Sequence, residues 1–185
     1  MPKRAKKISK RARIQSLLIL TAGVICLTTF VGYKIHRANR MSFEQVPPVN
    51  TKANLAHSPE SIEIIPLSIK LSVEPARVEG NRWEINEKGA SYLVSSAPLK
   101  DNGNTVIYAH NKATMFGSLS QIKIGYPITL KTREGKIHSY SVYKIETVTP
   151  DRVDVIKSNG EEELTLYTCT GFADTKRLVV KAKPI

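Results

Sequence analysis

The stretch LTLYTCTGFADTKRLVVKA, residues 164–182, contains two β-rich runs joined by a polar loop, TGFADTK. LTLYTC and RLVVKA are typical of two strands of an antiparallel hairpin. In that pairing Cys169 and Arg177 lie at or near opposite positions, and opposite residues share one face of a sheet. Because side chains alternate along a strand, the two leucines should point to the core, and Cys169 should point to the other face with Arg177.

More β-rich runs precede this hairpin, and turn sequences such as DNGN, REGK and SNGE separate them. These runs are SIEIIPLSIKLSV (61–73), NTVIYAH (104–110), YPITLKT (126–132) and IHSYSVYKIETVT (137–149). Apolar residues at i, i+4 and i+7 favour a helix in ATMFGSLSQI, and a second helical turn is expected near NEKGASYL. Many short strands with one or two short helices predict a mainly β fold, a closed or nearly closed antiparallel barrel of about eight strands.

An apolar segment lies near the N-terminus: IQSLLILTAGVICLTTFVGY, residues 14–33, has no charged residue. Twenty residues at about 1.5 Å each give about 30 Å of helix, the thickness of a hydrocarbon core. The alternative is a cleaved signal peptide, but the run is longer than usual and no A-x-A-like site follows it. The denser basic block before the segment predicts a cytoplasmic N-terminus and an exported remainder.

The net charge of +12 comes largely from residues that flank this segment. Ten basic residues lie before position 41, where there is no acidic residue; without them, 18 basic residues face 16 acidic ones, a balance of +2. A balance near neutrality, without a basic stripe, argues against nucleic-acid binding. The expected organisation is a basic tail (1–13), a transmembrane helix (14–33), a linker containing Pro47 and Pro48 (34–61) and one β-barrel domain (62–185).

Three side chains could form a nucleophilic site. Cys169 is the only cysteine outside the apolar segment, and a thiol acts as a nucleophile when it is a thiolate near positive charge. His110 ends an apolar strand and begins a loop, a usual position for a general acid or base. The guanidinium of Arg177 is a permanent fork of donors. Each residue taken alone also has a non-catalytic interpretation: Cys169 as a buried inert thiol, His110 as a structural histidine and Arg177 as a solvated arginine. One thiol and widely spaced histidines give no metal-ligand spacing, and no cofactor is expected.

These residues carry a family resemblance. TLYTC (165–169) resembles the TLxTC signature of the sortases, TVIYAHN (105–111) resembles the strand with their catalytic histidine, and KRLVVKA (176–182) resembles the last strand, which opens with their essential arginine. The resemblance implies that Cys169, His110 and Arg177 are catalytic. Ala109 and Asn111 depart from the glycine and arginine common beside the histidine, which leaves the subclass open.

The resemblance implies a sortase-like barrel behind a membrane anchor, in a bacterium of the Gram-positive type, with the catalytic domain outside the cell. It implies a cysteine transpeptidase that cleaves an LPxTG-type sorting signal between Thr and Gly through a thioacyl enzyme. The partners are surface proteins or pilins as substrates and an amine on a peptidoglycan precursor or a pilin as acceptor. The expected substrate-binding residues are Tyr167, Thr168, Val153, Val155 and Asn111.

Two other functions and one metal site are the alternatives to this interpretation. An L,D-transpeptidase needs a histidine and a glycine just before its cysteine, which LYTCTGF lacks. A membrane-tethered adhesion or assembly module with a buried structural cysteine remains the alternative. The acidic run GEEE (160–163) could bind calcium, but a solvated acidic turn is favoured because EF-hand-like spacing is missing.

Overall fold

The computed structural model describes residues 10–38, 43, 57–79 and 82–185, and the chain divides into two compact units, residues 1–38 and 39–185. Most of the expected basic tail and most of the expected linker lie outside the described residues. The domain boundaries drawn from the sequence therefore stay predictions.

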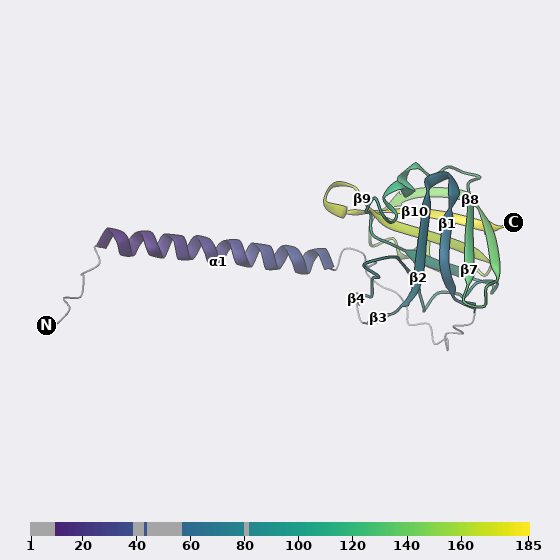
Figure 1. Cartoon of the computed structure of the whole chain (residues 1–185), viewed down its shortest axis with the longest axis horizontal. Helices are drawn as coiled ribbons and strands as arrows, with labels where there is room; N and C mark the ends of the chain where they lie inside the picture. The colour runs from purple at the N-terminus through teal and green to yellow at the C-terminus, as the bar shows by residue number, and fades with distance from the viewer. Residues whose placement is uncertain (1–9, 39–42, 44–56, 80–81) are drawn as a thin grey trace. The chain divides into compact units, whose positions relative to one another are not determined.

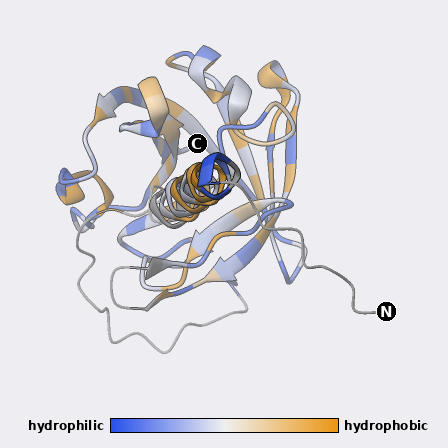
Figure 2. Ribbon diagram, turned by 90° about the vertical axis from the view of Figure 1, so that its left-hand side faces the viewer, coloured by the Kyte–Doolittle hydropathy of each residue, from blue (hydrophilic) through white to orange (hydrophobic). Residues whose placement is uncertain are grey.

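The described part of the first unit is one helix, α1, Lys10–Ala38. Within it, Arg13–Tyr33 is long and apolar enough to cross a membrane, by length and composition. Hydrophobic residues run along this helix in Figure 2, and hydrophilic ones gather at one end of it. The sequence expectation of an apolar N-terminal helix of membrane-spanning length is confirmed.

The second unit is a closed barrel of eight strands in the order β1-β2-β5-β6-β9-β10-β8-β7 (Figure 1). The strands are β1 (Pro59–Ile64), β2 (Ile69–Ala76), β5 (Ala90–Leu93), β6 (Asn104–Tyr108), β7 (Pro127–Thr132), β8 (Ile137–Val148), β9 (Glu163–Thr170) and β10 (Lys176–Pro184). A separate short ribbon pairs β3 (Val78–Glu79) with β4 (Arg82–Trp83). The predicted closed β-barrel is confirmed.

The barrel is not wholly antiparallel. Strand β2 pairs with β5 in parallel, and β6 pairs with β9 in parallel. Parallel neighbours need a long crossover, and the segment between β6 and β9 supplies one, because it contains β7 and β8. The β-rich segments of the sequence do not indicate which neighbours pair in parallel. Their alternation alone therefore predicted antiparallel hairpins throughout.

Local details follow from the turn residues. Pro66 breaks the first long run, as expected, into β1 and β2, with the 3-10 helix η2 (Ile65–Leu67) between them. The expected helix at ATMFGSLSQI is the 3-10 helix η3 (Gly117–Gln121). The helical turn expected near NEKGASYL was wrong, because that segment contains β5. Its four residues are all buried, so it shows no alternation from which a strand could be read.

Two apolar clusters lie on opposite faces of the central strands. The first fills the barrel and includes Leu164 and Leu166 of β9. The second lies on the other face and includes Tyr167 and Cys169 of the same strand. The alternation predicted for this strand is therefore confirmed, and the sulfur belongs to the outer cluster.

Candidate active site

Cys169 and Arg177 face each other across neighbouring strands. In the β9–β10 pair they are direct partners, as the hairpin predicted. Both side chains are buried: Cys169 is 4% exposed and Arg177 is 1% exposed. Nη1 of Arg177 donates to the carbonyl oxygens of Asp174 and Lys176, each at 3.0 Å. These bonds fix the guanidinium at the strand end that carries the sulfur.

His110 reaches the same end by a different route. Strand β6 runs parallel to β9, with Tyr108 opposite Tyr167, and the amide of Ala109 donates to the carbonyl of Tyr167 at 3.4 Å. His110 follows Tyr108 by two residues, and Cys169 follows Tyr167 by two residues. The parallel register therefore brings His110 and Cys169 to the same end of the barrel. The His110 side chain is 20% exposed, which leaves the imidazole within reach of solvent.

A carboxylate that the sequence did not predict lies against the imidazole of His110. Oε1 of Glu87 is 3.2 Å from Nε2 of His110, and its other oxygen accepts from Nζ of Lys112 at 3.2 Å. The side chain of Glu87 is 71% exposed, and its slight desolvation opposes ionisation. The hydrogen bond from Lys112 and the charges of Lys112 and His110 prevail and lower the pKa of the carboxyl. Glu87 lies in the segment taken for a helical turn, and nothing in its local sequence singles it out.

The residues expected to bind substrate fall into three positions. Tyr167, Val153 and Val155 belong to, or pack against, the outer cluster that contains Cys169; the two valines come from the 3-10 helix η4, Val153–Ile156. Asn111 is exposed and follows His110. Thr168 is buried on the core-facing side of β9, where its hydroxyl donates to the carbonyl of Ala109 at 2.8 Å. Thr168 thus ties the cysteine strand to the histidine strand.

Four aromatic rings pack together in the outer cluster, which also contains Cys169, and form its floor. Tyr108 and Tyr167 stack with centroids 5.1 Å apart at 14°. Trp83 meets both edge-on, at 5.3 and 5.9 Å. Phe43 packs on Tyr167 at 5.0 Å and on Trp83 at 6.0 Å. Burial raises the pKa of both tyrosine hydroxyls, so they stay neutral near pH 7.

The acidic run GEEE is engaged by neighbouring side chains. Glu161 pairs with Lys183 at 3.1 Å, Glu162 accepts from the hydroxyl of Tyr140 at 2.9 Å, and Glu163 pairs with Lys181 at 2.5 Å. Gly160 and Glu161 are exposed, as expected for a solvated acidic turn, whereas Glu163 is almost fully buried at the start of β9.

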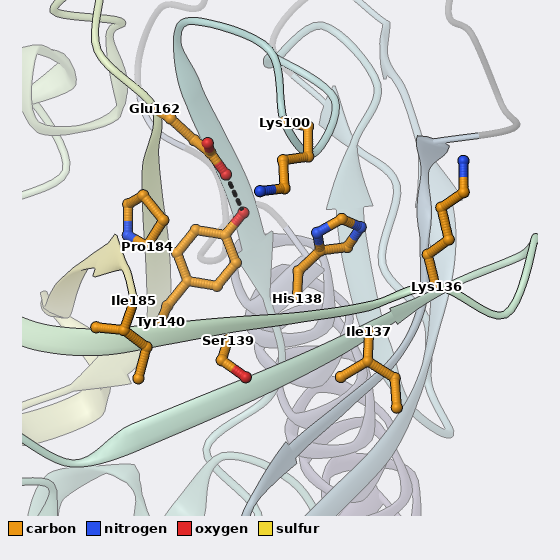
Figure 3. A pocket seen from close by; sticks show the side chains of 9 residues that line it. All are labelled: Lys100, Lys136, Ile137, His138, Ser139, Tyr140, Glu162, Pro184 and Ile185. Carbon is orange, nitrogen blue, oxygen red and sulfur yellow. Dashed lines mark hydrogen bonds between the residues drawn. The ribbon is translucent and has the colours of Figure 1, made fainter.

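A pocket of about 440 Å³ is lined by the side chains that Figure 3 labels. His138 and the Tyr140–Glu162 hydrogen bond line it, together with Lys100 and Pro184. Pro184 is the last residue of β10, the strand in which Arg177 is second. Seven residues of strand at about 3.3 Å each separate them by about 23 Å. This pocket is therefore not part of the candidate active site.

A family model described as a sortase domain matches residues 62–185. The chain belongs to the sortase family. Sortase A of Bacillus anthracis is 31% identical to this sortase over 128 residues, which are 64% of this chain and 56% of that protein. Among solved structures, sortase A from Corynebacterium diphtheriae is similar with a TM-score of 0.61 at 26% identity, covering 69% of this chain and 60% of that one. Sortase C from Clostridium perfringens SM101 has a TM-score of 0.59 at 25% identity, covering 82% and 85%.

This sortase spans 56% and 60% of the first two of these relatives. Sortases are cysteine transpeptidases that act on surface proteins with sorting signals, and they are associated with the membrane of Gram-positive bacteria. The barrel and the apolar N-terminal helix of this chain agree with that family.

Proposed function

We propose that this sortase is a membrane-anchored cysteine transpeptidase that cleaves an LPxTG-type sorting signal between Thr and Gly. The product would be transferred to an amine on a cell-wall precursor or on a pilin lysine. One observation carries the proposal: Cys169 and Arg177 are direct partners across β9 and β10, and the parallel strand β6 delivers His110 to the same end.

In the first half-reaction the sulfur of Cys169 attacks the Thr carbonyl carbon, and the carbonyl electrons move to its oxygen. Arg177 holds that developing oxyanion, for which a fixed, permanent cation is suited. The carbonyl then re-forms as the C–N bond breaks, and His110 gives the leaving amine the proton that it took from the Cys169 thiol. The result is a thioester between the Thr carbonyl and Cys169.

In the second half-reaction an incoming amine attacks the thioester. His110 takes the proton of this amine, the C–S bond breaks, and the sulfur leaves as thiolate. Water exclusion favours the amine over hydrolysis, and the burial of Cys169 among the aromatic rings supports such exclusion.

The substrate would lie over the outer cluster. Tyr167 provides its floor and Val153 and Val155 of η4 provide a wall, while Asn111 lies beside His110 at the rim. Thr168 acts through the strands, because its hydroxyl faces the barrel core and holds the carbonyl of Ala109. Helix α1 would anchor the chain with its N-terminus in the cytoplasm and the barrel outside.

The test is to incubate the full chain in detergent with LPxTG-type peptides and amine acceptors and to read the products by mass. We expect a thioacyl adduct on Cys169 and a peptide–amine product. Cys169→Ala should abolish both, whereas Cys26→Ala, in the apolar helix, should keep both. Equal product with Cys169→Ala would refute the proposal.

The burial of Cys169 favours one second candidate, a tethered adhesion module with a structural thiol. A methanethiosulfonate reagent separates the two. A sortase nucleophile should be modified in the folded protein, with loss of peptide cleavage. A structural thiol should react only when urea unfolds the barrel.

A further inference from the structure

The indole nitrogen of Trp83 is a buried donor without an acceptor. Trp83 is the only tryptophan of the chain and is 3% exposed. Within the part of the chain that the structure describes, its Nε1 has no hydrogen-bond partner. Such a donor loses its hydrogen bonds to water without gaining another, and native folds rarely keep one without a reason.

The indole lies beside the candidate active site. It contacts Tyr108 and Tyr167 edge-on. Cys169 follows Tyr167 by two positions on the same side of β9, and His110 follows Tyr108 by two positions just beyond the end of β6. Two residues of strand span about 7 Å. A peptide whose carbonyl carbon is at the sulfur therefore passes within a residue or two of the indole.

The short ribbon holds this donor in place. Trp83 pairs with Val78, the amide of Glu84 donates to the carbonyl of Arg77 at 3.0 Å, and the amide of Arg77 donates to Oε2 of Glu84 at 2.7 Å. The hydroxyl of Tyr108 donates to the carbonyl of Glu84. The indole is thus fixed before any ligand arrives, which lowers the entropic cost of using it.

The space beside the indole already accepts an apolar side chain. The ring of Phe43 lies there, against both Trp83 and Tyr167, and is 1% exposed. An apolar peptide residue that took the place of this ring would bring its own backbone carbonyls next to the indole. Backbone carbonyls are the strong acceptors that every extended peptide offers.

We propose that Trp83 is a substrate-positioning residue whose indole N–H donates a hydrogen bond to a backbone carbonyl of the sorting peptide, an apolar residue of which replaces the Phe43 ring. The inference rests on the proposed function, because the peptide is the substrate of that reaction. A donor that lacks an acceptor in the free protein gains one only when the peptide binds, so its effect falls on substrate binding.

The decisive variant is Trp83→Phe in the full chain in detergent. It keeps an aromatic ring in the cluster and removes only the donor and part of the ring volume. We expect kcat/KM for the peptide to fall about tenfold, mainly through KM, as one lost hydrogen bond implies. Tyr92→Phe is the matched control, because it removes one polar group from an aromatic ring of the other cluster; its KM should stay at the wild-type value. A wild-type KM in a folded Trp83→Phe protein would overturn the inference.

Fluorescence provides a second measurement if Trp83→Phe does not fold. In Cys169→Ala protein the emission comes from Trp83 as the lone tryptophan, and peptide occupancy is followed by calorimetry. Emission should move to longer wavelength in proportion to occupancy as the indole gains an acceptor. Unchanged emission at full occupancy would overturn the inference. The proposed function fails separately, by the absence of a thioacyl adduct on Cys169 in the wild-type protein.

Discussion

Two threonines of strand β9 allow a matched test of how the site is held. Thr168 and Thr165 are both buried, at 2% and 0% exposure. The hydroxyl of Thr168 donates to the buried carbonyl of Ala109 at 2.8 Å, whereas Oγ1 of Thr165 has no hydrogen-bond partner within the described residues. The same change to valine should therefore have opposite effects at the two positions.

The magnitudes follow from what each hydroxyl does. Thr168→Val removes one hydrogen bond and leaves the carbonyl of Ala109 with one donor fewer, so it should cost about 1–3 kcal/mol of stability. Thr165→Val removes a hydroxyl that is already desolvated without compensation, so it should be neutral or stabilise by up to about 2 kcal/mol. Thr168→Val should also lower turnover, because the broken bond joins the strands that carry Cys169 and His110.

The assay is urea unfolding followed by the fluorescence of Trp83, which is buried in the barrel unit. With a slope of about 2 kcal/mol per molar urea, the two variants should differ in midpoint by about 0.5–2.5 M. Equal losses in both variants would refute the distinction between a bonded and an unbonded hydroxyl. A wild-type midpoint for Thr168→Val would show that the bond to Ala109 does not hold the strands together.

Three further predictions concern charged or titratable groups. Arg177→Lys keeps the charge but loses the fork, so kcat should fall about 100-fold in the peptide assay; near-normal turnover would contradict the role of Arg177 as oxyanion donor. Glu87→Gln should lower kcat by only about two- to fivefold, because an exposed pair such as Glu87–His110 is weak. The effect should shrink at about 0.5 M salt, which screens exposed charges; an effect that persists in salt would exclude simple ion pairing. The pKa of His138 is lower than its ordinary value, mainly because the side chain is partly buried and secondly because Lys100 and Lys136 are positively charged. The unfolded chain therefore binds the proton more tightly, and stability that is complete above the unfolded pKa of about 6.5 is lost as pH falls through it. His138→Gln should lose less stability than the wild type between about pH 7.5 and 5.5, measured by urea midpoints, and an equal loss in both proteins would show that His138 is not the source.

The sequence predicted the parts of the fold that depend on local pattern. Alternation in LTLYTC gave the two faces of β9, and the length of the loop after it gave the pairing of Cys169 with Arg177. Pro66 marked the break between β1 and β2. Each of these features depends on residues that are close in sequence, so the pattern is enough to specify it.

Other features depend on partners that are distant in sequence. The parallel pairings of β2 with β5 and of β6 with β9 come from crossovers that no short run reveals. The contact of Glu87 with His110 joins residues 23 positions apart. Trp83 lies in a two-residue strand, too short for any periodicity, although its indole contacts both tyrosines of the floor. These contacts are set by tertiary packing, and residue types alone give no signal for them.

The apolar core itself enforces the placement of the nucleophile. Leu164 and Leu166 of β9 are buried inside the barrel, and side chains alternate with a period of two. A shift of one residue in β9 would turn both leucines outward and turn Cys169 inward, away from Arg177, so the register that buries the leucines is also the register that presents the sulfur. Strand β6 is bound to the same register through the pairing of Tyr108 with Tyr167. Changes that loosen the core at Leu166 should therefore reduce the reactivity of Cys169 toward peptide before they unfold the barrel, although Leu166 lies on the opposite face of the strand.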